Sequence, residues 1–92
     1  MSLRKKIEVL TTFIELEEKK DKFNRYFYYF HDSKTRRNII AREFIKSGNG
    51  YVYGANLPDY KHLADSRGWV KVKNFDENTL IDIIEKAIEA HR

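Results

Sequence analysis

Lysines and arginines are interleaved with aromatic residues through the middle of this 92-residue sequence. Residues 23–73 hold ten Lys and Arg against four Asp and Glu, a net charge of +6, whereas residues 1–22 carry +1 and residues 74–92 carry −3. Cationic side chains bind phosphates, and an exposed aromatic ring stacks on an unpaired base. The pattern predicts a nucleic-acid-binding surface that contains Lys34, Arg36, Arg37, Arg42, Tyr51, Arg67, Trp69, Lys71 and Lys73.

The cations and the rings have different expected roles in this surface. Either Trp69 or Tyr51 is the expected stacking residue. The alternating pattern of residues 69–73 predicts a half-exposed strand that carries Trp69, Lys71 and Lys73 on one face. The alternative is that the indole fills the core and that the cations are only hydrated. The expected phosphate contacts come from Lys34, Arg36, Arg37, Arg42, Lys71 and Lys73.

One histidine–aspartate pair suggests catalysis. His31 and Asp32 lie where an aromatic run ends, and an imidazole beside a carboxylate can act as a general base or bind a metal ion. No P-loop, nucleophile-elbow or zinc-protease motif accompanies them, and the absence of cysteine excludes disulfides and thiolate metal sites. We therefore expect a non-enzymatic protein without cofactor or metal. A small hydrolase or nuclease that uses His31 and Asp32 is the second alternative.

An apolar stripe at helical spacing marks the N-terminal segment. Its residues recur every three or four positions, which predicts an amphipathic helix within residues 1–22. This helix either packs on the protein's own sheet or pairs with another helix. The second possibility gives the first alternative function, a protein-interaction or adaptor domain that dimerises through Leu3, Ile7, Leu10 and Ile14.

Strand and helix signals alternate along the rest of the chain. The aromatic run within residues 25–31 predicts a central strand that is covered on both sides. Residues 36–46 favour a helix because a Gly-rich stop follows; the rival interpretation is a strand with Ala41 and Ile45 inward, which would make the sheet an antiparallel meander. Further expected elements are strands at 51–53 and 69–73, a short helix between 56 and 68, and a long amphipathic helix after Asn74 or Asp76.

The length and composition are those of a single compact domain over residues 1–92, with the N-terminal helix at 1–22 and mixed sheet and helices at 23–92. The expected class is α/β or α+β, with three short strands alternating with helices. No stretch approaches eighteen consecutive apolar residues, so no membrane span is expected. The leading hypothesis is a small cytoplasmic regulatory protein whose basic centre contacts nucleic acid, with a homo-oligomer or a protein partner as further possibilities.

Overall fold

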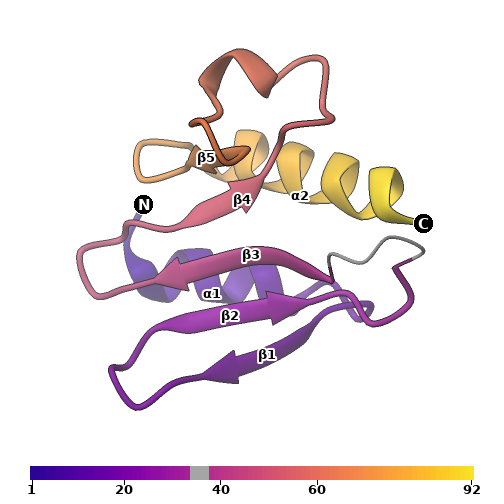
Figure 1. Ribbon diagram of the computed structural model, residues 1–92. Helices are drawn as coiled ribbons and strands as arrows, with labels where there is room; N and C mark the ends of the chain where they lie inside the picture. The colour runs from indigo at the N-terminus through magenta and orange to yellow at the C-terminus, as the bar shows by residue number, and fades with distance from the viewer. Residues whose placement is uncertain (34–37) are drawn as a thin grey trace.

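Five strands form one antiparallel sheet in the computed structural model of the chain, which describes residues 1–33 and 38–92. Each strand pairs with the next one along the chain. The two α-helices of the described residues cover the same face of this sheet (Figure 1). The elements are α1 (Leu3–Thr11), β1 (Glu17–Lys20), β2 (Tyr26–Tyr29), β3 (Ile39–Phe44), β4 (Tyr51–Tyr53), the 3-10 helix η1 (Lys61–Leu63), β5 (Trp69–Lys71) and α2 (Glu77–His91).

The structure is of the α+β class, but the predicted order of three strands alternating with helices is wrong. The segment predicted as a helix at 36–46 contains β3, while residues 36 and 37 lie outside the described part. β3 is hydrogen-bonded to β2 on one side and to β4 on the other, so sheet pairing satisfies its backbone. The rival interpretation, a meander flanked by terminal helices, describes the sheet correctly, although Ile45 is only partly buried where Ala41 is fully buried.

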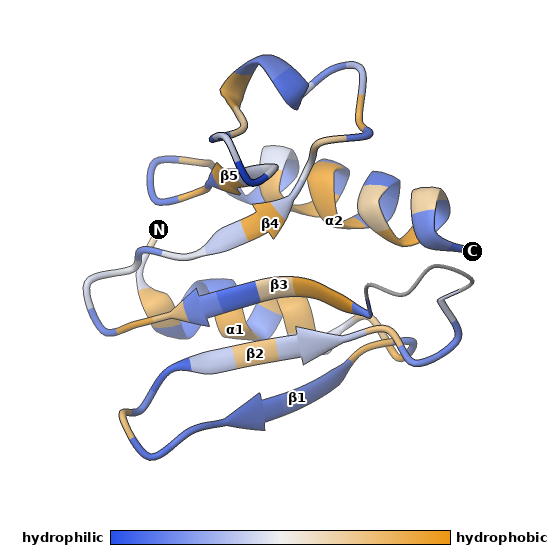
Figure 2. Ribbon diagram, in the orientation of Figure 1, coloured by the Kyte–Doolittle hydropathy of each residue, from blue (hydrophilic) through white to orange (hydrophobic). Residues whose placement is uncertain are grey.

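The helix predicted over residues 1–22 is too long. α1 ends at Thr11, and the charged residues Glu17–Lys20 form β1 with all four positions exposed. Figure 2 shows this strand as the hydrophilic border of the sheet. β1 pairs with β2 along its whole length, and the Tyr28 hydroxyl donates a hydrogen bond of 2.7 Å to the Glu18 carboxylate. Backbone pairing, rather than apolar side chains, stabilises this strand.

The remaining predicted elements are confirmed in whole or in part. The C-terminal helix is α2, and the carboxylate of its N-cap, Asp76, accepts a hydrogen bond of 2.8 Å from the Thr79 amide. The strand at 51–53 is β4, and the strand predicted at 69–73 is the shorter β5. The short helix predicted between 56 and 68 is reduced to η1. Near it, an isolated bridge between Ala64 and Val70 covers the outer side of β5.

The hydrophobic core lies between the sheet and the two helices. Val52 and Val70 are paired across β4 and β5 and are fully buried, as is Tyr28 of β2 at 1% exposure. The expectation that β2 is covered on both sides is wrong, because Phe27 and Tyr29, its neighbours on the strand, are only half-buried. Successive residues of a strand point to opposite faces, so the face opposite the helices remains accessible.

The turn between β3 and β4 is closed by a tight contact between a ring and a glycine. Phe44 is fully buried and meets the Tyr28 ring edge to face at a centroid distance of 5.9 Å. A Cβ atom added at Gly50 would lie 2.5 to 2.6 Å from three carbon atoms of the Phe44 ring. The backbone of Gly50 therefore packs directly against this ring.

Two buried tyrosine hydroxyls make the fold sensitive to alkaline pH. Burial, together with a hydrogen bond to Glu18, raises the pKa of Tyr28, and burial with a hydrogen bond to Asp82 raises the pKa of Tyr60 to about 12. Above about pH 10 the unfolded chain releases these protons while the folded chain keeps them, so this contribution to stability is present below pH 10 and is lost above it. We expect urea midpoints to fall between about pH 9 and pH 11.

A Tyr28→Phe variant separates this effect from the titration of lysines. It lacks the hydroxyl with the more strongly raised pKa, so its urea midpoint should fall less over the same pH range than that of the wild type. Equal losses in the two proteins would contradict the assignment.

Candidate nucleic-acid interface

One cross-strand row on the accessible sheet face joins three of the predicted residues. Arg42 of β3 is opposite Tyr51 of β4, and Tyr51 is opposite Lys71 of β5. The neighbouring pair Val52 and Val70 points into the core, so Tyr51 and Lys71 point away from the helices. The fold thus brings a ring and two cations from distant parts of the sequence onto one surface.

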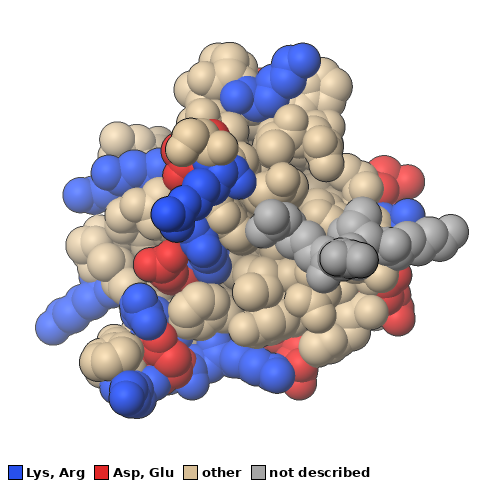
Figure 3. All heavy atoms as spheres, viewed as in Figure 1, with Lys and Arg blue, Asp and Glu red and all other residues tan. Residues whose placement is uncertain are grey.

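The cations concentrate at one end of the sheet. β1, β3 and β5 all finish at this end, because alternate strands of an antiparallel meander run in the same direction. Residues 19–25, 42–46 and 71–73, here called the basic end, hold eight Lys and Arg against Asp21 and Glu43, a net charge of +6. Figure 3 shows most of the blue atoms gathered over the side of the molecule where the β1–β2 and β3–β4 turns lie.

Aromatic rings lie among these cations. Phe23, in the turn between β1 and β2, keeps 65% of its surface exposed, and the charged groups of Lys22 and Arg25 lie 5.2 and 5.3 Å from the centre of its ring. Arg25 also lies 5.7 Å from the half-buried ring of Phe27. Sequence reasoning did not select these residues. The available signal was the close alternation of cations and rings in residues 22–27.

Trp69 does not lie where a base could stack on it. The indole is 4% exposed and is covered by the Arg42 guanidinium, whose carbon lies 4.1 Å from the ring centre, and by the ring of Tyr53 at 5.3 Å. The predicted half-exposed face that carries Trp69 with Lys71 and Lys73 is therefore wrong for the tryptophan. Its side chain supports Arg42 instead.

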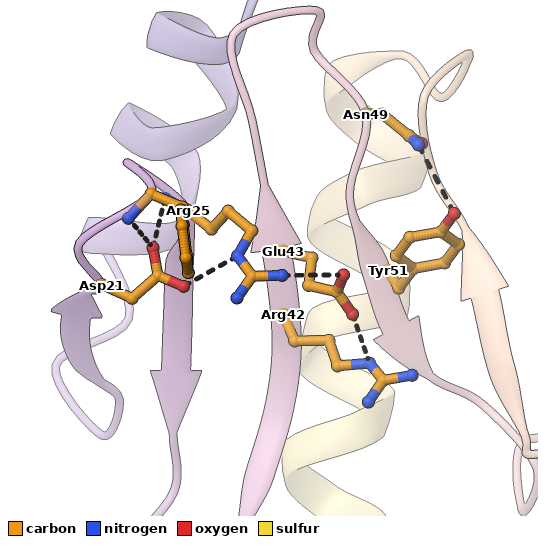
Figure 4. Close-up of polar contacts among 7 residues, drawn as sticks. Asp21, Arg25, Arg42, Glu43, Asn49 and Tyr51 are labelled. Carbon is orange, nitrogen blue, oxygen red and sulfur yellow. Dashed lines mark hydrogen bonds and ion pairs between the residues drawn. The ribbon is translucent and has the colours of Figure 1, made fainter.

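Arg42 belongs to a chain of ion pairs that crosses the sheet face (Figure 4). Its Nε lies 3.2 Å from one carboxylate oxygen of Glu43, and the other oxygen of Glu43 lies 3.7 Å from a terminal nitrogen of Arg25. Arg25 in turn pairs with Asp21 at 2.7 Å. These carboxylates neutralise both arginines in the free protein.

Lys71 and Lys73 are exposed, and neither forms an ion pair within the described residues. The same holds for Lys46 in the turn after β3. Lys71 belongs to the cross-strand row, and Lys73 follows two residues later, so both cations lie at the basic end. These three lysines are the cations best placed to meet a phosphate.

A buried lysine holds two turns of the basic end together. Lys6 of α1 is fully buried and donates hydrogen bonds to the backbone carbonyls of Gly48 and Lys73, the latter at 2.7 Å. Burial, and then the nearby charge of Lys73, lowers the pKa of the Lys6 ammonium. This side chain fixes the position of the β3–β4 turn relative to the segment that follows β5.

Of the other cations in the predicted surface, Arg67 lies in the part of the chain that the structure describes. Lys34, Arg36 and Arg37 lie outside the described residues. Arg67 is exposed in the turn that precedes β5, where the Asp65 carboxylate accepts hydrogen bonds from the amides of Trp69 and Arg67, which lower the pKa of Asp65. Arg67 therefore lies at the opposite end of β5 from Lys71.

His31 and Asp32 are both exposed in the turn after β2. The Nε2 atom of His31 contacts a carboxylate oxygen of Glu17, and its ring stacks on Tyr29 at a centroid distance of 6.0 Å. Across residues 1–33 and 38–92, no three side chains of His, Asp and Glu converge in a way that could hold a metal ion. The hydrolase or nuclease hypothesis stays a prediction.

The predicted dimerisation stripe divides into buried and exposed residues. Leu10 is fully buried in the core, whereas Leu3 and Ile7 are half-buried along a shallow groove beside Tyr26. Ile14 lies beyond the end of α1 and is 95% exposed. Part of the stripe is thus buried in the protein's own core, and dimerisation through the remaining residues stays a prediction.

Neither family models nor curated proteins nor solved structures match the chain. Among the described residues, no helix has the length and apolar character needed to cross a membrane.

Proposed function

We propose that this protein binds single-stranded nucleic acid through the basic end of its sheet. The observation that carries the proposal is the meeting of three separate chain segments with a net charge of +6 around the exposed ring of Phe23 and the half-buried ring of Tyr51. Phosphates need cations, and unpaired bases need rings to stack on. The basic end offers both on one surface.

Each group of residues has a distinct role in this proposal. Lys46, Lys71 and Lys73 contact phosphates, and Phe23 and Tyr51 stack on bases. A double helix keeps its bases stacked inside, so exposed rings favour a single strand over a duplex. Trp69 acts only by supporting Arg42, and the protein meets its nucleic-acid partner in the cytoplasm.

The salt dependence of binding tests this proposal. We expect a fluorescently labelled single-stranded oligonucleotide to bind in about 50 mM salt, with the association constant falling as salt rises. Three lysine–phosphate contacts predict a log–log slope of about −2, since each contact on a single strand contributes about −0.7. Fluorescence anisotropy measured over a series of salt concentrations gives this slope.

The matched control is a duplex of the same sequence, to which the protein should bind less tightly because its bases are not available for stacking. No binding to the single strand at low salt, or a slope near zero, would contradict the proposal.

A further inference from the structure

Two arginines from neighbouring strands hold one carboxylate between them. Arg25 precedes β2 and Arg42 belongs to β3, and the Glu43 carboxylate lies within 3.7 and 3.2 Å of their guanidinium nitrogens. The three side chains are partly accessible, with 38%, 29% and 34% of the side-chain surface of Arg25, Arg42 and Glu43 exposed. The Nε atom of Arg42 itself is buried and makes no hydrogen bond, so an anion from solution reaches it only where the Glu43 carboxylate moves away.

An irregularity in the sheet places Glu43 beside Arg42. Tyr26 is opposite Phe44 and Tyr28 is opposite Ala41, so three residue steps on β3 correspond to two on β2. Such a bulge allows consecutive side chains to share a face, which regular alternation would forbid. Glu43 has a φ of 58°, a left-handed conformation that is uncommon for a residue other than glycine.

Aromatic rings hold both guanidinium groups in place. Arg42 lies over Trp69 with its guanidinium carbon 4.1 Å from the ring centre, and Arg25 lies 5.3 and 5.7 Å from the rings of Phe23 and Phe27. The Asp21 carboxylate further restrains Arg25. The two donors are therefore positioned for an anion before any ligand arrives.

We propose that Arg25 and Arg42 form a phosphate subsite, which the Glu43 carboxylate occupies in the free protein. This inference rests on the proposed function and names one part of the same surface. Guanidinium groups donate to phosphate oxygens as they do to carboxylate oxygens, so a backbone phosphate takes the place of Glu43. When the lysines of the basic end hold a nucleic-acid strand, the next phosphate of that strand is at a high effective concentration near the two arginines. This favours replacement of the Glu43 carboxylate by the phosphate.

Removal of the competing charge tests the subsite. We expect Glu43→Gln to bind the single-stranded oligonucleotide about tenfold more tightly than the wild type, because charge-assisted hydrogen bonds to phosphate replace an internal ion pair. The salt slope should steepen by about 0.7 for each additional phosphate that the arginines bind. Glu43→Gly provides a second variant, since glycine accepts the left-handed backbone without a Cβ.

Glu85→Gln is the matched control, because Glu85 is an exposed carboxylate on α2, which covers the other face of the sheet, and the change in net charge is the same. It should tighten binding by no more than about twofold. Adding Arg25→Gln to Glu43→Gln should cancel the increase in affinity. If the wild type binds but both Glu43 variants match Glu85→Gln, the subsite is wrong and the proposed function stands. If no variant binds, both proposals fail.

Discussion

Reversing the charge of Lys71 and Lys73 together should reduce the affinity for a single-stranded oligonucleotide by about a hundredfold or more. Both cations are exposed at the basic end, and neither has an ion-pair partner among the described residues. Each charge-assisted hydrogen bond contributes about 1.5–3 kcal/mol, and glutamates at these positions would also repel phosphates. Anisotropy titrations of the Lys71→Glu/Lys73→Glu variant, at the same salt concentration as the wild type, measure the loss.

A second double variant controls for net charge. Arg4 lies on α1 and Lys61 on η1, both exposed and outside the basic end. The Arg4→Glu/Lys61→Glu variant changes the net charge by the same amount, so its affinity should fall only through the general field of the protein. Circular dichroism verifies that both variants remain folded. Equal losses in the two variants would show that the basic end has no specific role.

Gly50→Ala should destabilise the fold by about 3 kcal/mol, a large part of the stability of a small domain. The new methyl group would lie 2.5 to 2.6 Å from three atoms of the Phe44 ring, including the atom nearest the backbone. The ring is fully buried and packed against Tyr28, so it cannot turn away without disturbing the core. A fall in melting temperature of about 12 °C or more is expected for a domain of this size.

Ser47→Ala is the control for this substitution. Ser47 is exposed in the same turn, and its hydroxyl accepts only a long hydrogen bond of 3.4 Å from Asn49. Its melting temperature should stay within about 2 °C of the wild type. A Gly50→Ala protein with a similar melting temperature would mean that the β3–β4 turn can rearrange around the ring.

The C-terminal helix was predicted correctly because a regular period and a cap coincide in it. α2 has an apolar stripe, an N-cap at Asp76 and an acidic residue in its first turn, and every one of these signals is local. β1 has no such signal, because Glu17–Lys20 contains only charged residues. Its strand conformation comes from pairing with β2, which no periodicity in the sequence reveals.

β3 shows how an irregular strand can imitate a helix. Ala41 and Phe44 are three residues apart and both buried, a spacing that normally places two side chains on one helix face. Here the bulge opposite Tyr26 and Tyr28 creates this spacing within a strand. The bulge removes the alternation by which strands are recognised, and the Gly-rich stop that favoured a helix belongs to the β3–β4 turn instead.

The candidate site was predictable only in part, because the positions of some of its residues depend on other strands of the sheet. Tyr51 and Lys71 belong to short strands with clear signals, and the structure places them together on the accessible face. The position of Trp69 depended on Arg42, which reaches it from another strand. Phe23 lies in a turn whose place at the basic end follows from the strand order alone.

The two borders of the sheet bear on how copies of the protein would behave when crowded on one polynucleotide. β1 presents charge at all four of its positions, and the bridge between Ala64 and Val70 shields the border at β5. Neither edge of the sheet favours pairing with a strand of a neighbouring molecule. Copies lined up along a common ligand would therefore remain separate particles instead of fusing into fibrils.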